Sequence, residues 1–307
     1  MGPAMADQTS LTFDRDFAPA YGTTEILSPL IRRVVCRNPG PFTFTGTASF
    51  ILGEKTLAVI DPGPEDEAHL SALLEAIGDK PLSHIFITHT HLDHSPLARR
   101  LKALTGAETV GYGVPPRAST AASGAVRLDA SRDKNFRPDI ALKDGETIAS
   151  AEWTLTGIHT PGHTSDHMAF AFAEERALFP GDHVMAWSTS VVAPPDGNMG
   201  QYLRSLEALL DRDDDIYFPT HGPPRMEPKA LVRALLAHRH MREGAILARL
   251  KSGPKSLPEL VATIYADVDP RLHAAAGQTT LAHLQHLIAQ GKVVHATEKA
   301  GDSYRLS

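Results

Sequence analysis

Short apolar runs alternate along the chain with segments in which apolar residues recur at helical spacing. The runs Phe50–Leu52, Thr56–Ile60 and Ile85–Ile87 are rich in β-branched and aromatic residues, which predicts buried strands. Helical spacing over Glu67–Ile77, closed by Gly78, predicts a helix between two of these strands. Such alternation of strand and helix is typical of an α/β fold.

The same alternation continues along the next part of the chain. A helix is expected to open at Asn198 and to end at Leu210. Ser95 followed by Pro96 combines a preferred N-cap with a residue suited to the first helical turn, so a helix is expected from there to Gly106. Residues 115–137 lack clear periodicity and are expected to form a long loop. Further strands are expected at Val110–Tyr112, Trp153–Ile158, Met168–Phe172, Ala177–Phe179 and Ile216–Phe218.

The last part of the chain has a different pattern. A long helix is expected over Leu231–Leu250, and Ser256 with Glu259 forms the capping box of a second helix. A third apolar stripe ends at Gly291, and two short strands follow. Three helices and a hairpin are typical of a winged-helix-like α+β domain.

Composition and charge fit a globular protein of two domains. The 307 residues include 42% apolar and 21% charged residues, which suffices for a packed core and argues against global disorder. Residues 1–224 carry more acidic than basic side chains and residues 225–307 the reverse. We therefore expect a larger α/β domain over 1–224 and the winged-helix-like domain over 225–307.

Several classes of protein are disfavoured. The net charge of −6 gives no whole-chain reason to expect nucleic acid or an acidic membrane as a partner. A single cysteine, Cys36, excludes an intramolecular disulfide and a cysteine-based metal site. Residues Met1–Phe17 show no apolar core of a secretory signal, and the apolar runs are too short to span a bilayer. A cytoplasmic location is expected.

A burst of polar residues follows the strand expected at Ile85–Ile87. His89, His91, Asp93 and His94 place three imidazoles and a carboxylate within six positions. Loops at strand ends are the usual place for a site in an α/β protein. Structural histidines usually occur singly, whereas neutral imidazole and carboxylate together suit zinc, iron or manganese. The burst therefore predicts a metal site.

Three further loops after expected strands supply a histidine or an aspartate. His163 lies in Thr160–Thr164, Asp182 follows Pro180-Gly181, and His221 lies between Thr220 and Gly222. Four ligands would suit one tetrahedral ion, and seven with one shared carboxylate would suit two. The candidate ligands are His89, His91, Asp93, His94, His163, Asp182 and His221.

These motifs, with the strand end Asp61-Pro62-Gly63, resemble those of the metallo-β-lactamase-fold hydrolase superfamily. With the C-terminal extension, the chain looks most similar to the LACTB-like branch. The resemblance implies an αββα sandwich with two divalent ions, zinc first and manganese or iron as alternatives. It implies His89, His91 and His163 at one ion, Asp93, His94 and His221 at the other, and Asp182 bridging them.

The reaction implied is hydrolysis of an ester, thioester, lactone or phosphodiester by a metal-bridging hydroxide. Asp93 is the catalytic candidate because, besides binding metal, it could orient the hydroxide or carry its proton. Single-stranded RNA is a possible substrate only because some relatives cleave it. True β-lactamases of this fold lack an aspartate at the position of Asp182, so native β-lactamase activity is not expected.

Two other functions stay open. A mononuclear iron sulfur-dioxygenase of the glyoxalase-like type shares much of this motif pattern, and metal analysis would separate it from a dinuclear hydrolase. A nucleic-acid-binding protein with an inactive hydrolase domain is the second alternative, but the intact ligand set disfavours it. The C-terminal part does not interleave basic residues with aromatic ones, so a packing or dimerisation role is favoured over nucleic-acid binding.

The sequence indicates residues for substrate contact less clearly than it indicates the candidate metal ligands. Phe42 and Phe44 lie in a segment that resembles the hairpin overhanging the metal site in this superfamily, and Trp187 follows Asp182 closely. Packing is the alternative role for all three aromatic side chains. The histidines His159, His167 and His183 could contact a metal ligand, but an ordinary loop role is preferred for each one.

Overall fold

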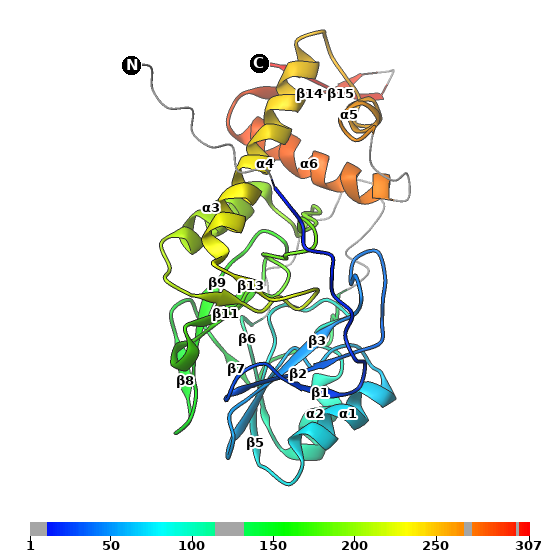
Figure 1. The fold of residues 1–307 in the computed structure, drawn as a ribbon. Coiled ribbons are helices and arrows are strands. Elements are labelled where there is room, and N and C mark those ends of the chain that lie inside the picture. The colour runs from blue at the N-terminus through cyan, green and yellow to red at the C-terminus, as the bar shows by residue number, and fades with distance from the viewer. Residues whose placement is uncertain (1–10, 114–131, 267–271, 299–300) are drawn as a thin grey trace, which may run out of the picture.

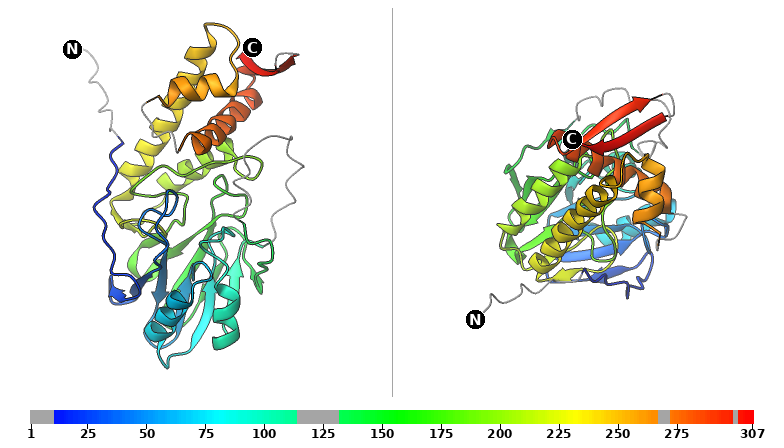
Figure 2. Two further views of the ribbon diagram at one scale, coloured as in Figure 1. Left: turned by 90° about the vertical axis from the view of Figure 1, so that its right-hand side faces the viewer. Right: turned by 90° about the horizontal axis from the view of Figure 1, so that it is seen from above.

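The structure is a computed structural model that describes residues 11–113, 132–266, 272–298 and 301–307. Two sheets pack face to face with helices on their outer faces, which confirms the expected αββα sandwich (Figure 1). A smaller group of helices and a hairpin stands on one end of this sandwich (Figure 2). Of the loop expected at 115–137, only residues from 132 onward lie within the described part.

The first sheet has an antiparallel and a parallel half. Its strands, in spatial order, are β1 (Thr24–Ile26), β2 (Ile31–Val35), β3 (Ala48–Leu52), β4 (Leu57–Ile60), β5 (Leu82–Phe86), β6 (Glu108–Gly111) and β7 (Ile140–Ala141). Strands β1 to β4 pair antiparallel, and β4 to β7 pair parallel. Parallel neighbours need crossovers, which α1 (Glu67–Ile77) supplies between β4 and β5 and α2 (Ala98–Thr105) between β5 and β6. Their side chains, such as Leu73 and Leu101, pack with Ile85 on the outer face of the sheet.

The second sheet is mostly antiparallel. Its strands, in spatial order, are β13 (Arg225–Met226), β12 (Ile216–Tyr217), β11 (Ala177–Phe179), β10 (Met168–Phe172), β9 (Thr154–His159) and β8 (Thr147–Ala149). A 3-10 turn, η2 (Ala173–Glu175), joins β10 to β11, and only β11 and β12 run parallel. Helix α3 (Met199–Leu210) covers the outer face, where Tyr202 and Leu206 pack against Leu178.

Aromatic side chains fill the space between the two sheets. Phe50 of the first sheet meets Phe179 of the second with ring centroids 4.9 Å apart. Phe86 meets Phe170 edge-on at 5.2 Å. Trp153 is fully buried in the same cluster. Burial of such large rings contributes much of the apolar stabilisation of a core, so it fixes the two sheets, and the loops at their ends, relative to each other.

The C-terminal part is the winged helix domain expected from the sequence. Its elements are α4 (Pro228–Leu250), α5 (Leu257–Ile264), α6 (His273–Ala289), β14 (Val293–Glu298) and β15 (Gly301–Leu306). The capping box of α5 is confirmed, because the Ser256 amide donates to the Glu259 carboxylate at 2.7 Å and the Glu259 amide to the Ser256 hydroxyl. In α4, Leu235 belongs to the sandwich cluster and Leu250 to the C-terminal cluster. The division at residues 224 and 225 stays a prediction.

The expected N-cap at Ser95 is wrong. Helix α2 begins at Ala98, and its N-cap, Leu97, makes no side-chain capping bond. The Ser95 hydroxyl instead donates back to the carbonyl of His91 at 3.4 Å, and the Leu97 amide donates to the carbonyl of Gly63 at 3.1 Å. The segment after β5 therefore folds as turns that hold its polar loop against the end of β4, and the helix can start only afterwards. None of the described helices has the length and apolar character needed to cross a bilayer.

Candidate metal centre

The candidate ligands come together at one edge of the sandwich. They reside on the loop after β5, the β9–β10 connection, and the loops after β11 and β12. Two groups can each hold a metal ion, because in each group the candidate ligand atoms lie within 4.8 Å of one another. The first group is His89, His91, His163 and Asp182, and the second is Asp93, His94 and His221.

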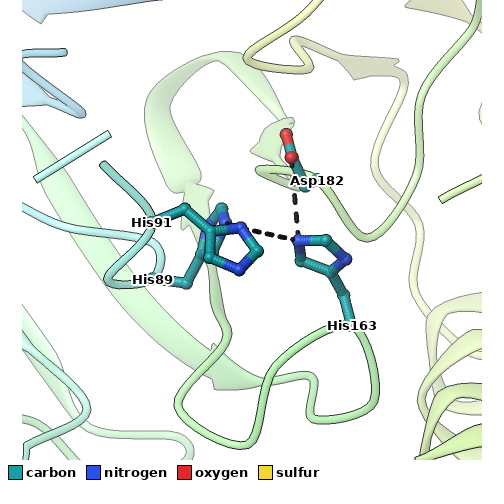
Figure 3. Close-up of side chains that lie close together, drawn as sticks. All are labelled: His89, His91, His163 and Asp182. Atoms are coloured by element: carbon teal, nitrogen blue, oxygen red, sulfur yellow. Dashed lines mark hydrogen bonds and ion pairs between the residues drawn. The ribbon is translucent and has the colours of Figure 1, made fainter. Parts of the chain in front are cut away.

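In the first group, three imidazoles converge from two loops. Nδ1 of His91 lies 2.9 Å from Nε2 of His89 and 3.2 Å from Nε2 of His163. Nε2 of His163 lies 3.7 Å from Oδ2 of Asp182. Figure 3 shows these rings and the carboxylate directed toward a common point. Nitrogen atoms that face one another this closely are suited to share a cation.

In the second group, the carboxylate of Asp93 faces two imidazoles. Oδ2 of Asp93 lies 3.2 Å from Nε2 of His221 and 3.6 Å from Nε2 of His94. The second oxygen of Asp182, Oδ1, lies 3.4 and 3.6 Å from the same two nitrogens. Asp182 thus presents one oxygen to each group, although the sequence alone could not place its side chain.

Several ligand atoms lack a partner of their own. Nε2 of His94, Nε2 of His221 and Oδ1 of Asp182 are buried without a hydrogen bond. Buried polar atoms without a partner are costly and call for an explanation such as a bound ion. Their positions and their chemistry, imidazole nitrogen and carboxylate oxygen, fit divalent metal ions.

The opposite nitrogen of several histidines is held by the protein. Nδ1 of His163 donates to the carbonyl of Val191 at 2.6 Å, and Nδ1 of His221 donates to the carbonyl of Gly46 at 3.0 Å. A carbonyl can only accept, so these contacts place the proton on Nδ1 and leave the lone pair of Nε2 directed inward. Gly46 has φ 140°, and an added Cβ would lie 2.1 Å from the carbonyl oxygen of Cys36, so only glycine fits there.

Asp61 holds the imidazole of His94 in the same way, through a hydrogen bond at Nδ1. Its Oδ2 lies 2.8 Å from Nδ1 of His94 and accepts from the hydroxyls of Thr88 at 2.7 Å and Thr220 at 3.1 Å. Its Oδ1 accepts from the Thr88 amide at 2.8 Å. The sequence signal was only the strand-ending Asp61-Pro62-Gly63, so this role of Asp61 was missed.

The pKa values of two histidines in the first group and of His94 in the second shift in opposite directions. Burial lowers the pKa of His91 to about 3 and that of His89 well below its usual value, so both rings are neutral. For His94, burial is outweighed by the nearby carboxylates of Asp93, Asp182 and Asp61, which raise its pKa. For Asp182, burial is outweighed by His221 and His94, which lower its pKa. The carboxylate of Asp182 is therefore ionised and can balance cationic charge.

Four of the candidate ligands line a cavity of about 760 Å³. They are His91, Asp93, His163 and Asp182, and side chains of α4 and α6 line the same cavity. Phe42 and Trp187 line it too, and their contact with a substrate stays a prediction. Phe44 is not among the lining residues; its ring stacks on Trp187 with centroids 4.8 Å apart and planes 10° from parallel.

The three remaining histidines have different surroundings. Nε2 of His167 accepts from the amide of Asp182 at 3.2 Å, so His167 touches the ligand loop. His183 is fully buried beside the ring of Tyr202, with centroids 4.6 Å apart. His159 stacks on Tyr112 at 3.8 Å, which is an ordinary packing role.

Comparison with known proteins identifies the same two parts. Residues 42–221 match the family model of the metallo-beta-lactamase superfamily, and residues 256–302 match the beta-lactamase associated winged helix domain. The chain is similar to a lactamase-like protein of Pestalotiopsis microspora, with 30% identity over 76% of this chain and 67% of that protein. It is 28% identical to an atrochrysone carboxyl ACP thioesterase of Claviceps purpurea (strain 20.1), over 82% of this chain and 77% of the relative.

A solved structure shows the same fold. The beta-lactamase domain protein from Burkholderia ambifaria superposes with a TM-score of 0.80 at 22% identity, covering 95% of this chain and 96% of that one. The superposition thus includes the C-terminal part as well as the sandwich. The chain belongs to the metallo-beta-lactamase superfamily and carries the winged helix domain associated with that fold.

Proposed function

We propose that this protein is a dinuclear metal-dependent hydrolase that cleaves a thioester or a related ester. The observation that carries the proposal is the position of Asp182, which has Oδ2 toward His163 and Oδ1 toward His94 and His221. A carboxylate with one oxygen toward each group is suited to bridge two ions. His89, His91 and His163 would then hold the first ion, and Asp93, His94 and His221 the second.

Zinc suits this ligand set best, and manganese or iron also binds imidazole and carboxylate. Bound in pairs, such ions polarise a carbonyl and make hydroxide available near neutral pH. The protein orients three of the proposed ligands. Hydrogen bonds to Val191, Gly46 and Asp61 fix the imidazole rings of His163, His221 and His94, respectively. The side chain of Asp93 is 25% exposed, so it can bind metal and also accept a proton on the cavity side.

A thioester is the favoured substrate class. Water and a thioester give a carboxylic acid and a thiol, with no further reactant. The thioesterase name of the Claviceps purpurea relative and the partly apolar cavity, with Phe42 and Trp187 in its wall, support this choice. Oxygen esters, lactones and the phosphodiesters of single-stranded RNA use the same hydroxide and are the alternatives to test.

The test is turnover of this substrate panel by protein loaded with zinc or manganese, together with metal analysis. We expect two ions per chain, thioester hydrolysis, and loss of activity in His89→Ala. The matched control is His159→Ala, which removes a histidine that packs on Tyr112 outside the two groups. Full activity in His89→Ala would refute the metal mechanism. A single iron with oxygen consumption would favour the sulfur-dioxygenase alternative instead.

A further inference from the structure

The winged helix domain forms one wall of the cavity that contains the metal ligands. Arg239 and Arg242 of α4 line it, as do Ala276 and Thr279 of α6. Figure 2 shows these helices standing over the end of the sandwich. A cavity of about 760 Å³ is far larger than an acyl carbonyl and its attacking water require, so it has room for a longer part of a substrate beside the residues of α4.

The two arginines bring positive charge to this wall. Arg239 is 2% exposed, and its NH2 donates to the carbonyl of Ser190 at 2.5 Å. Arg242 donates to the carbonyl of Ile264 at 3.0 Å, and its guanidinium lies 4.5 Å from the centre of the Tyr265 ring. Nε of each arginine is buried without a partner. Their hydrogen-bonding capacity is therefore only partly used.

No carboxylate of the described residues forms an ion pair with either arginine. The acid nearest in sequence, Glu243, points its Oε1 at Nδ1 of His286, 2.7 Å away, and at His283. A buried charge without a counter-charge, as at Arg239, is costly. Arg242 is partly buried, so its guanidinium can be reached from the cavity. By contrast, Arg132 in the same cavity is neutralised by Asp166 at 3.0 Å and Asp196 at 3.1 Å.

We propose that Arg242, backed by the buried Arg239, is an anion-binding subsite that receives an oxyanion group of the substrate distant from the bond that is cleaved. This inference rests on the proposed function, since it places the reacting carbonyl at the metal end of the same cavity. The guanidinium fork suits a carboxylate or a phosphate equally well. A carboxylate would come from the acyl side of a thioester, whereas a phosphate would come from the thiol side.

Two substrate pairs distinguish these sources. Adipoyl and hexanoyl thioesters of N-acetylcysteamine differ by a carboxylate on the acyl side. Hexanoyl thioesters of phosphopantetheine and pantetheine differ by a phosphate on the thiol side. We expect wild-type protein to prefer the anionic member of one pair in kcat/KM. Arg242→Met should reduce that preference by about tenfold, mainly through KM, because a charge-assisted hydrogen bond is lost. Arg242→Lys should retain part of it.

The matched control is Arg233→Met, which removes an exposed guanidinium of α4 that does not line the cavity and should leave the preference unchanged. Equal kcat/KM within both pairs for the wild type, or a preference that Arg242→Met leaves intact, would overturn the inference while the proposed function stands.

If the proposed function is wrong, the wild-type protein will cleave none of the four thioesters. The subsite is then judged by calorimetric binding of the corresponding thioether analogues, which cannot be hydrolysed. About tenfold tighter binding of an anionic analogue, lost in Arg242→Met, supports the subsite. Equal affinities overturn it.

Discussion

At the scale of single residues, Asp182 is the side chain on which the proposed dinuclear site depends most. Its carboxylate is the only side chain of the described ligand set that faces both groups, with Oδ2 toward His163 and Oδ1 toward His221. Asn at this position keeps the shape but replaces one charged oxygen by a donor. Asp182→Asn should lower the metal content below two per chain and reduce kcat by about a hundredfold or more.

Metal analysis and kcat of the same preparation check this prediction. Asp211→Asn is its control, because Asp211 is an exposed carboxylate at the end of α3. A variant at residue 182 that keeps two ions and wild-type kcat would show that the carboxylate does not bridge.

Asp61 offers a second residue-scale test, away from direct metal contact. Its two oxygens accept from Thr88, Thr220 and His94, so an amide nitrogen in Asp61→Asn would face donors only. Asn also tolerates the positive φ of 47° at this position, so the backbone is not disturbed. We expect a loss of about 1–3 kcal/mol in unfolding free energy and a metal affinity about 10–100-fold weaker. Urea unfolding and metal titration measure the two effects, and wild-type values of both would contradict them.

The convergence of the candidate ligands was predictable from the sequence, but the residues that hold their rings in place were not. His89, His91, Asp93 and His94 follow one strand within a few positions, so residue type and spacing were sufficient. Arg242 gave no such signal, because its position in the cavity depends on how α4 packs over loops that are distant in sequence. Contacts between remote segments are decided by packing, which local patterns do not encode.

At the scale of elements, the bounds of helices and strands were predicted accurately where the apolar pattern was uninterrupted. Helix α1 and strands β10 and β11 begin and end where their apolar patterns predict. Strand β2 was missed because Arg32 and Arg33 interrupt its apolar residues. Arg33 is nevertheless buried, with its charge met by Glu25 at 2.6 Å, and Arg32 reaches the carbonyl of Ala76. Such compensation comes from neighbouring elements and is invisible in the strand's own sequence.

Two serines that look alike in the sequence should respond differently to mutation. Ser256 caps α5 in a complete capping box, so Ser256→Ala should lower the unfolding free energy by about 1 kcal/mol. Ser95 makes one long contact with the carbonyl of His91 and caps no helix, so Ser95→Ala should cost clearly less. Chemical denaturation of both variants measures the difference. A larger loss for Ser95→Ala would contradict the position of the α2 start.

At the scale of the whole molecule, buried histidines should make stability depend on pH. Burial lowers the pKa of His69 to about 4 from a usual value of 6.5. The unfolded chain therefore binds more protons than the folded one between these values, so stability is present above pH 6.5 and is lost as the pH falls toward 4. This single group should contribute a loss of about 3 kcal/mol over that window. Unfolding of metal-free protein from pH 7 to 4 measures the slope, which His69→Gln should reduce; an unchanged slope would refute the assignment to His69.

Helix α4 contributes buried side chains to both hydrophobic cores, so it can couple their unfolding. Leu235 is fully buried in the sandwich cluster and Leu250 is 3% exposed in the C-terminal cluster, yet both lie on the same continuous helix. Truncation of a buried leucine to alanine costs about 2–5 kcal/mol. If α4 couples the two cores, Leu235→Ala and Leu250→Ala should each lower one shared Tm. In a Trp187→Phe background, which leaves Trp153 of the sandwich core as the one tryptophan of the sequence, far-UV circular dichroism and tryptophan fluorescence should then show coincident transitions in both variants. An early loss of helical signal in Leu250→Ala with unchanged tryptophan fluorescence would instead show that the winged helix domain unfolds independently.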